Sequence, residues 1–267
     1  MLEHIKNSYL FLKEFYYTCF RYSTKGNVAM GAPSIPIDIS NKKIAVYTCI
    51  VGNYDPLIEP LTTEQGVDYY VFTDQKVSND SKWEKKDITL WEEYQTLSPS
   101  QLNRKIKMLP HLYLSGYDYS IYIDGNVEIH NSLTSLVKEM GDCGFGVHYH
   151  RTRDCIYHEL VRIIYLKKTN VQLAKSQMDA YRKEGFPRHY GLFENTVLIR
   201  NHHDEITGRL MEAWWEEYQK YSTRDQLSLP YIIWKTNYDR TKIHIISRNI
   251  DRSQIFKRVR SHININM

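Results

Sequence analysis

Blocks of apolar and polar positions along the chain predict where strands and helices form. From Lys43, the run KIAVYTCIVG is continuously apolar and rich in β-formers until Gly52 and Asn53. The run VDYYVFTD at 67–74 has the same character and ends at Asp74. Apolar runs of this length are typical of strands that are buried on both faces of a parallel sheet. We therefore expect two parallel strands near the start of the main domain.

A helix with one apolar face is predicted next, in the segment SPSQLNRKIKMLPHLYLSG from Ser98 onward. Its opening Ser-Pro is a helix-start signal, and helical spacing places Leu102, Ile106 and Leu109 on one face. The basic residues lie on the other faces: Arg104, Lys105 and Lys107.

The rest of the chain continues the alternation of strands and helices. A third strand is expected in YDYSIYIDGNVEI, and further segments are a helix around 156–184, a strand at 196–200 and an aromatic helix through Trp214, Trp215 and Tyr218. Strands that alternate with helices predict an α/β layered domain.

The first forty residues differ from this pattern. Residues 1–27 mix aromatic and aliphatic side chains with Lys and Arg at helical spacing, and a segment containing Gly, Pro and Ser follows to about residue 40. We expect a helical extension and linker at 1–40 and the main domain at 41–267. The extension could touch a membrane surface or pack against the domain.

Composition narrows the classes of function. A net charge of +4 in 267 residues is too mild and too evenly spread for a nucleic-acid footprint. The cysteines lack a CxxC pair and close Cys/His spacing, so we expect neither a zinc module nor a disulfide framework. We see no membrane-spanning run and no signal peptide, and therefore expect a cytoplasmic protein. The cysteines are Cys19, Cys49, Cys143 and Cys155.

Polar residues just after each predicted strand are the first candidates for a ligand site, because ligands of open α/β sheets bind at the carboxyl ends of strands. Thr48 and Tyr54 lie at the end of the first strand, where backbone and an aromatic ring can approach a nucleotide. Asp74 ends the second strand and can accept hydrogen bonds from a ribose or base.

The third strand ends in Asp124-Gly125-Asn126. Asp124 is the best candidate to orient a divalent cation on a diphosphate, since hard cations prefer carboxylate oxygens. Asn126 is neutral and binds Mg²⁺ or Mn²⁺ more weakly. A plain turn is the alternative, because all three residues are turn formers. Arg104 and Lys107 are candidates to neutralise the diphosphate; a solvated helix face is their alternative.

Two later segments carry further candidates. His148 and His150 alternate along an extended stretch and so share one face, either as metal ligands or as hydrogen-bonding groups of an acceptor groove. Arg224, Asp225 and Gln226 open a predicted helix, where they either cap it or place a carboxylate beside a sugar.

Taken in order, these motifs resemble a known group, the pectin- and mucilage-type glycosyltransferase-like family of plants, formerly a domain of unknown function, with bacterial members. The resemblance runs from about Ile44 to about His262. It is carried by VYTCIVGNYD, YYVFTD, NRKIKMLPH, YSIYIDGN, HYHRTRDCIYHE, YRKEGF, ENTVLIRNH and WWEEYQKYSTRDQLSLPY. No single motif is decisive, but their order is specific.

The resemblance implies a GT-A-like fold, a Rossmann-like mixed sheet flanked by helices, with a UDP-sugar donor, a glycan or polysaccharide acceptor and retention of configuration. Asp124 matches the degenerate Asp-x-Asp turn, and His262 would be an additional metal ligand. Residues 224–226 match the Arg-Asp-Gln motif. Asp225 is then the leading catalytic candidate, with Glu194 second, and His148, His150, Arg224 and Gln226 bind the acceptor.

Two other classes of function stay open at this stage. A non-catalytic glycan-binding or assembly protein is favoured by the missing second carboxylate at Asn126. A phosphatase with Asp124 as nucleophile would need another acidic residue two positions away, where Tyr122 and Asn126 stand.

Overall fold

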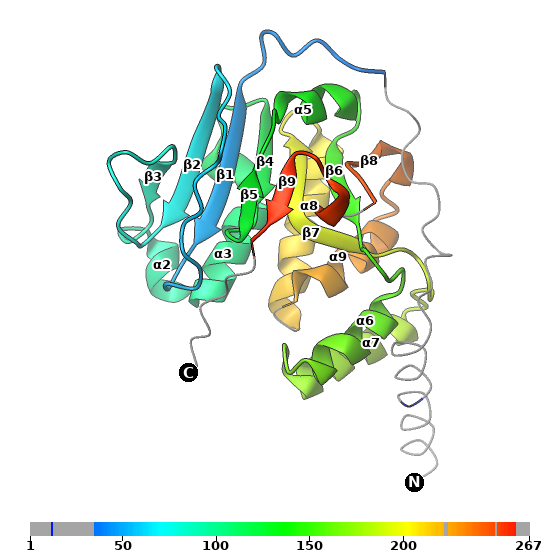
Figure 1. The fold of residues 1–267 in the computed structure, drawn as a ribbon. Helices are drawn as coiled ribbons and strands as arrows, with labels where there is room; N and C mark the ends of the chain where they lie inside the picture. The colour runs from blue at the N-terminus through cyan, green and yellow to red at the C-terminus, as the bar shows by residue number, and fades with distance from the viewer. Residues whose placement is uncertain (1–11, 13–34, 222–223, 249, 260–267) are drawn as a thin grey trace.

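A seven-stranded mixed sheet forms the centre of the domain (Figure 1). The computed structural model describes residues 12, 35–221, 224–248 and 250–259. The strands lie in the order β3-β2-β1-β4-β7-β6-β8, and β7 alone runs antiparallel to its neighbours β4 and β6. Their bounds are β1 Ile44–Ile50, β2 Val67–Thr73, β3 Glu84–Asp87, β4 Tyr119–Ile123, β6 Phe145–Tyr149, β7 Phe193–Asn201 and β8 Ile243–Ile245. The α/β prediction is confirmed.

The first two predicted strands are β1 and β2, paired in parallel from Ile44 opposite Val67 onward. The third predicted segment divides in two, because β4 ends at the predicted turn 124–126 and the chain there leaves the main sheet. Its second part is β5 (Val127–Ile129), which pairs antiparallel with β9 (Phe256–Arg258) in a separate two-stranded sheet. The acidic turn therefore joins the two sheets.

Helices pack on both faces of the main sheet (Figure 1). They are α2 Glu92–Thr96, α3 Pro99–Met108, α4 Pro110–Tyr113, α5 Thr134–Met140, α6 Ile156–Tyr165, α7 Val171–Lys183, α8 Glu205–Lys220 and α9 Asp225–Lys235, with short 3-10 turns η1 Arg240–Lys242 and η2 Ile250–Arg252. The single helix predicted at 156–184 is wrong: Lys167 adopts φ 54°, and Asn170 starts a new helix by accepting a hydrogen bond from the Leu173 N–H.

Helix α3 starts as the sequence predicts. Ser98 accepts from the backbone N–H of Gln101, whose side chain accepts from the N–H of Ser98, and Pro99 occupies the first turn. Leu102 and Ile106 are buried against β1. This capped helix sets the position of the basic residues that it carries.

The core is divided by the main sheet, because successive side chains of a strand point to opposite faces. Tyr47 and Phe72 pack with Trp214 of α8 on one face, whereas Val46 and Val71 pack on the face covered by α5. Both strands are thus buried on both faces, as their apolar runs predict.

The described part of the predicted linker, 35–40, lies against the domain, where Ile37 donates a backbone hydrogen bond to Lys138. The predicted N-terminal helix lies outside the described residues, Leu12 excepted, and the boundary after residue 40 stays a prediction. Among the helices that the structure describes, none has the length and apolar character needed to cross a bilayer.

Candidate functional site

Three strand ends meet at one edge of the sheet. β2, β1 and β4 are neighbours and parallel, so their carboxyl ends lie side by side, as predicted. Asp74, directly after β2, accepts hydrogen bonds from the Gly52 N–H (3.0 and 3.2 Å) and the Tyr94 hydroxyl (3.3 Å). Thr48 of β1 is buried, whereas Tyr54 in the following loop is 65% exposed. Of the residues predicted to contact a nucleoside, Tyr54 thus has its ring on the surface, and Asp74 joins the loop after β1 to α2 by hydrogen bonds.

Lys107 lies at the centre of the site and links two carboxylates. Its Nζ is 3.2 Å from Oδ1 of Asp124 and 2.9 Å from Oδ2 of Asp225. The side chain is only 2% exposed and lies over the ring of Tyr122, 4.8 Å from the centroid. Nε of Arg104, one turn earlier on α3, is 3.6 Å from the same oxygen of Asp225. The alternative of a solvated face is therefore wrong for Lys107.

The charges at this cluster favour ionised side chains. Burial raises the pKa of the Asp225 carboxyl, but the charges of Lys107 and Arg104 outweigh burial and hold that pKa well below its usual range. Burial lowers the pKa of Arg104, and the charge of Asp225 reverses this, so the net change is upward. Asp225 is thus a carboxylate at neutral pH and not a proton donor.

The acidic turn is held by backbone hydrogen bonds. The Asp124 N–H donates to Thr196 O (2.8 Å), and the Val259 N–H donates to Asn126 O (2.9 Å). A Cβ on Gly125 would lie 3.1 Å from a side-chain carbon of Ile50, so the close approach of β1 favours glycine here. The turn therefore has a defined conformation next to β1.

The fit of this turn to a hard cation is partial. Asp124 supplies one carboxylate and Asn126 an amide oxygen, the ligand class that Mg²⁺ and Mn²⁺ prefer. Lys107 already balances one oxygen of Asp124. His262, the third predicted ligand, lies outside the described residues.

The antiparallel strand β7 adds polar groups that the sequence reasoning largely missed. Because β7 runs against β4, its first residues lie at the edge where β4 ends. Glu194 is buried and ion-paired with Arg258 of β9. Both amide atoms of Asn195 and the hydroxyl of Thr196 are buried without a hydrogen-bond partner among the described residues. Buried polar groups of this kind need a hydrogen-bond partner, which is often water or a ligand. The signal in the sequence is the motif ENTVLIRNH, in which Asn195 and Thr196 directly follow Glu194.

The predicted acceptor residues fall into two groups. Gln226 donates to Phe193 O (2.6 Å), and the charge of Arg224 acts on both Asp225 and Glu159. These two residues flank Asp225 at the start of α9 and belong to the cluster.

The two histidines lie on and just after β6, beside the residues of β7 and α6 that the start of α9 faces: His148 pairs with Glu194, and His150 Nε2 is 3.7 Å from Glu159. His148 is fully buried, with Nδ1 2.8 Å from Ser247 Oγ, so it would reach an acceptor only through groups around it. His150 accepts from the Arg153 N–H (2.9 Å) through Nδ1. Burial lowers the pKa of His148 to about 4 and that of His150 to about 3.

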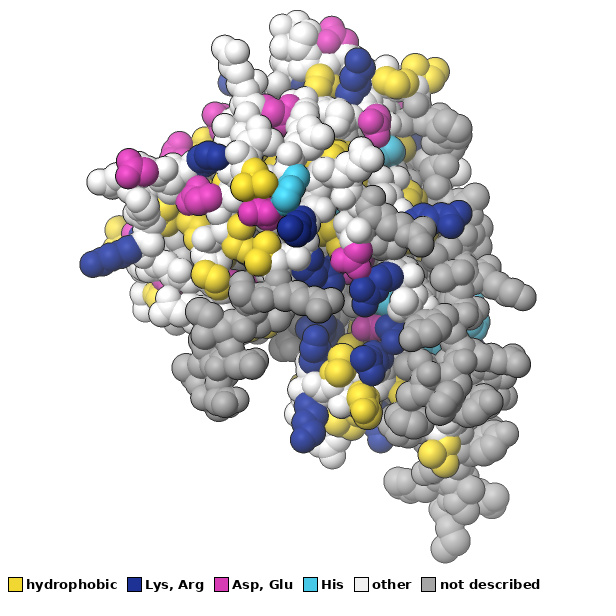
Figure 2. Space-filling view, viewed as in Figure 1, with side chains coloured by type: hydrophobic (Ala, Val, Ile, Leu, Met, Phe, Trp, Pro, Cys, Tyr) yellow, Lys and Arg dark blue, Asp and Glu magenta, His cyan; other side chains and the backbone are white. Residues whose placement is uncertain are grey.

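One face of the molecule carries a concentration of positive charge. Figure 2 shows Lys and Arg side chains beside β9 and over α6 and α7. The sequence alone suggested an even spread of charge, because these residues come from segments that are distant in the chain. A basic face of this kind raises the local concentration of anionic ligands.

A mixed sheet with polar side chains at the edge where its strands end is typical of α/β domains that bind a ligand at that edge. The chain belongs to the TOD1/MUCI70 glycosyltransferase-like domain family, whose model matches residues 21–262. This match and the mixed sheet confirm the predicted family and fold class. A search of curated proteins returns no match.

Three solved structures show distant similarity. The bifunctional glycosyltransferase WbbM is 14% identical, with 80% of this chain and 40% of that chain covered and a TM-score of 0.45. Mouse xyloside xylosyltransferase 1 is 9% identical, with 76% and 84% covered and a TM-score of 0.43. The mannosyltransferase Ktr4p of S. cerevisiae is 12% identical, with 90% and 78% covered and a TM-score of 0.41. The chain thus spans less than half the length of WbbM.

Proposed function

We propose that this chain transfers a sugar from a nucleotide-sugar donor, UDP-linked, to a glycan or polysaccharide acceptor with retention of configuration. The observation that carries the proposal is the chain of charges at the edge where the strands end, in which the buried Lys107 and Asp225 meet the partly exposed Asp124. A buried network of this kind costs desolvation energy, and such networks are common where charge must be handled during a reaction.

The donor lies along the strand ends in this proposal. Thr48, Tyr54 and Asp74 contact the nucleoside, and Arg104 and Lys107 face the diphosphate. As the bond to the sugar breaks, negative charge grows on the leaving diphosphate, and a cation already in place stabilises it without reorganisation. Mg²⁺ or Mn²⁺ on Asp124 and Asn126, with His262, would add to that charge stabilisation.

The reacting sugar lies beside Asp225. A carboxylate that stays ionised can stabilise an oxocarbenium-like centre while the acceptor attacks from the side of the leaving group. The amide nitrogen of Gln226 is held by Phe193 O, which fixes that side chain next to the carboxylate. Glu194 is the second candidate for this catalytic role, because its ion pair with Arg258 already balances part of its negative charge.

A second function, a non-catalytic glycan-binding or assembly protein, is favoured by one observation. Asn126 supplies no charge, and Lys107 balances Asp124, so the turn has less negative charge than a metal site with two carboxylates. Such a protein would bind oligosaccharide and have no affinity for UDP or UDP-sugars.

We propose a cytoplasmic site of action, with peripheral contact at the inner face of the membrane. Cys49, Cys143 and Cys155 are free thiols, which suits a reducing compartment. The basic face in Figure 2 suits anionic lipid headgroups.

The test is a thermal-shift screen of nucleotide sugars with and without Mn²⁺, followed by measurement of UDP release with candidate acceptors. A donor at about 100 times its Kd should stabilise the fold by about 2.7 kcal/mol. Asp225→Asn should release UDP at least about 100-fold more slowly while staying folded, since it removes the charge beside the sugar.

The matched control is Asp179→Asn on α7, whose carboxylate is 63% exposed and pairs with Arg182. Asp179→Asn should release UDP at the same rate as the wild type. Full UDP release by folded Asp225→Asn and Asp124→Ala would refute the site, and uptake of glycan without nucleotide would favour the binding protein.

A further inference from the structure

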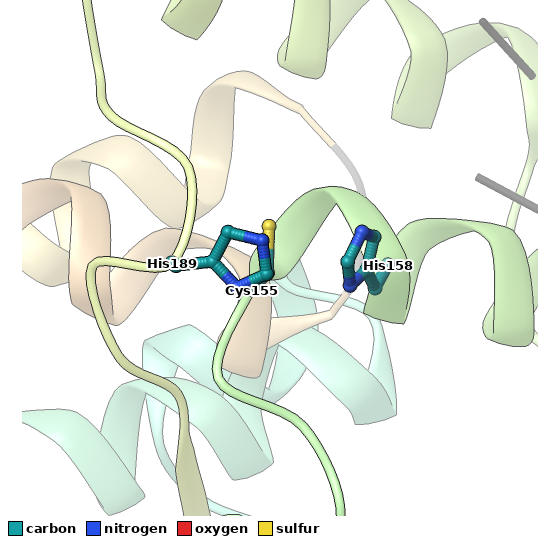
Figure 3. Close-up of side chains that lie close together, drawn as sticks. All are labelled: Cys155, His158 and His189. Carbon is teal, nitrogen blue, oxygen red and sulfur yellow. The ribbon is translucent and has the colours of Figure 1, made fainter. Parts of the chain in front are cut away.

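A cysteine and two histidines that the proposed function does not use lie close together (Figure 3). The Sγ of Cys155 and one ring nitrogen each of His158 and His189 lie within 4.8 Å of one another. Tetrahedral zinc with bond lengths of about 2.0 to 2.3 Å spaces such atoms by about 3.5 Å, so a small inward shift closes the site. Sequence reasoning expected no close Cys/His spacing, and Cys155-x-x-His158 shows that this was wrong.

His189 is oriented as a metal ligand would be. Its Nδ1 lies 2.8 Å from Oδ1 of Asp154, a fully buried carboxylate, which directs Nε2 away from Asp154. Metal-bound histidines commonly donate their second ring N–H to a carboxylate in this way. The backbone of His189 also adopts φ 58°, which is uncommon for a residue with a side chain.

The other two groups suit the same chemistry. Cys155 directly precedes α6, and its side chain is buried. His158 lies on the first turn of that helix and is also buried, and its ring centroid is 5.1 Å from that of His189. Arg188 donates to Nε2 of His158 (3.0 Å), and a metal bound at that nitrogen would displace it.

We propose that Cys155, His158 and His189 bind a transition metal of the zinc class, with Asp154 orienting His189. Thiolate and imidazole are the ligands that zinc prefers, and they differ from the oxygen ligands at Asp124. The metal ties the loop between α7 and β7 to the start of α6. That loop leads into Phe193 and Glu194, so the metal would steady one wall of the proposed active site.

The first test uses the wild-type chain. After removal of loosely bound metal, elemental analysis should find about one equivalent of zinc. Replacement by Co²⁺ should give a thiolate-to-cobalt charge-transfer band and the visible spectrum of a tetrahedral site. A wild-type protein that retains no zinc and whose cobalt form lacks the thiolate band would overturn the proposal, whatever the behaviour of any variant.

Variants locate the metal. Cys155→Ser should lose both the zinc and the charge-transfer band, and Asp154→Asn should weaken zinc affinity about 10- to 100-fold. Cys143→Ser is the matched control, since Cys143 is also a buried free thiol, and Asp124→Asn separates this site from the donor site. Both controls should keep the metal, and its loss in either would argue against these ligands.

Discussion

At the scale of single residues, the candidate site depends on one buried cation. Lys107 follows Ile106 on α3 but lies outside the predicted apolar face, yet it is almost as buried as Ile106 because Asp124 and Asp225 supply counter-charges. Asp225 in turn receives Arg104 as a second cation. Removing one member leaves a buried charge without its closest partner, which costs more than the pair contributes.

The variant Lys107→Met tests how much the buried cation contributes to stability. The variant keeps most of the apolar stem and leaves Asp225 buried without its closest cation, so the free energy of unfolding should fall by about 3 to 5 kcal/mol. Urea denaturation followed by circular dichroism measures it. Lys105→Met, which breaks the partly exposed pair with Glu93, should cost less than about 1 kcal/mol. If both variants lost the same free energy of unfolding, the buried ion pairs of Lys107 would contribute no more to stability than the partly exposed pair of Lys105.

At the scale of elements, the site combines a helix whose start the sequence predicts with a strand whose direction the sequence does not predict. The start of α3 is fixed by neighbours in sequence, Ser98 and Gln101. The direction of β7 is fixed by its insertion between β4 and β6. That direction brings Glu194 to the edge where β4 ends.

The cap of α3 gives a prediction at this scale. Ser98→Ala removes the side-chain acceptor of the Gln101 N–H and should lower the free energy of unfolding by about 1 kcal/mol. The exposed Ser115 provides the control, and Ser115→Ala should change stability by less than about 0.5 kcal/mol. Indistinguishable urea midpoints for the two variants would mean that the capping box does not hold the helix start.

At the scale of the whole molecule, buried neutral histidines make stability depend on pH. The folded pKa values of His148 and His150, about 4 and about 3, lie below the value of about 6.5 for an unfolded chain. As pH falls below about 6.5, the unfolded chain binds protons that the folded chain does not. The stabilising contribution is therefore complete above about pH 6.5 and is lost as pH falls toward 4.

We expect the free energy of unfolding to fall by about 1 to 2 kcal/mol for each of these histidines between pH 7 and pH 5. Urea titrations at both pH values measure the change. Between pH 7 and pH 5, the free energy of unfolding should fall less in the variant His148→Gln than in the wild type. If the variant and the wild type had the same pH dependence, His148 would not contribute to the loss of stability at low pH.

Part of the candidate site could be predicted from local sequence. The apolar runs that end at Gly52 and Asp74 predict buried parallel strands, and polar residues at strand ends predict a ligand edge. Arg104 and Lys107 follow from the helical spacing after Ser98. Asn195 could not be singled out, because nothing in a β-rich segment shows that both amide atoms will be buried without a partner.

The sequence by itself determined the α/β class, the first two strands, the amphipathic α3 and the turn at Asp124, because each depends on residues close together in the chain. Only the tertiary structure decided that Asp225 meets Lys107 and that His189 meets Cys155. The physical reason is that periodicity and capping act over a few residues. Ion pairs and ligand clusters depend on strand order and helix packing, which bring distant segments together.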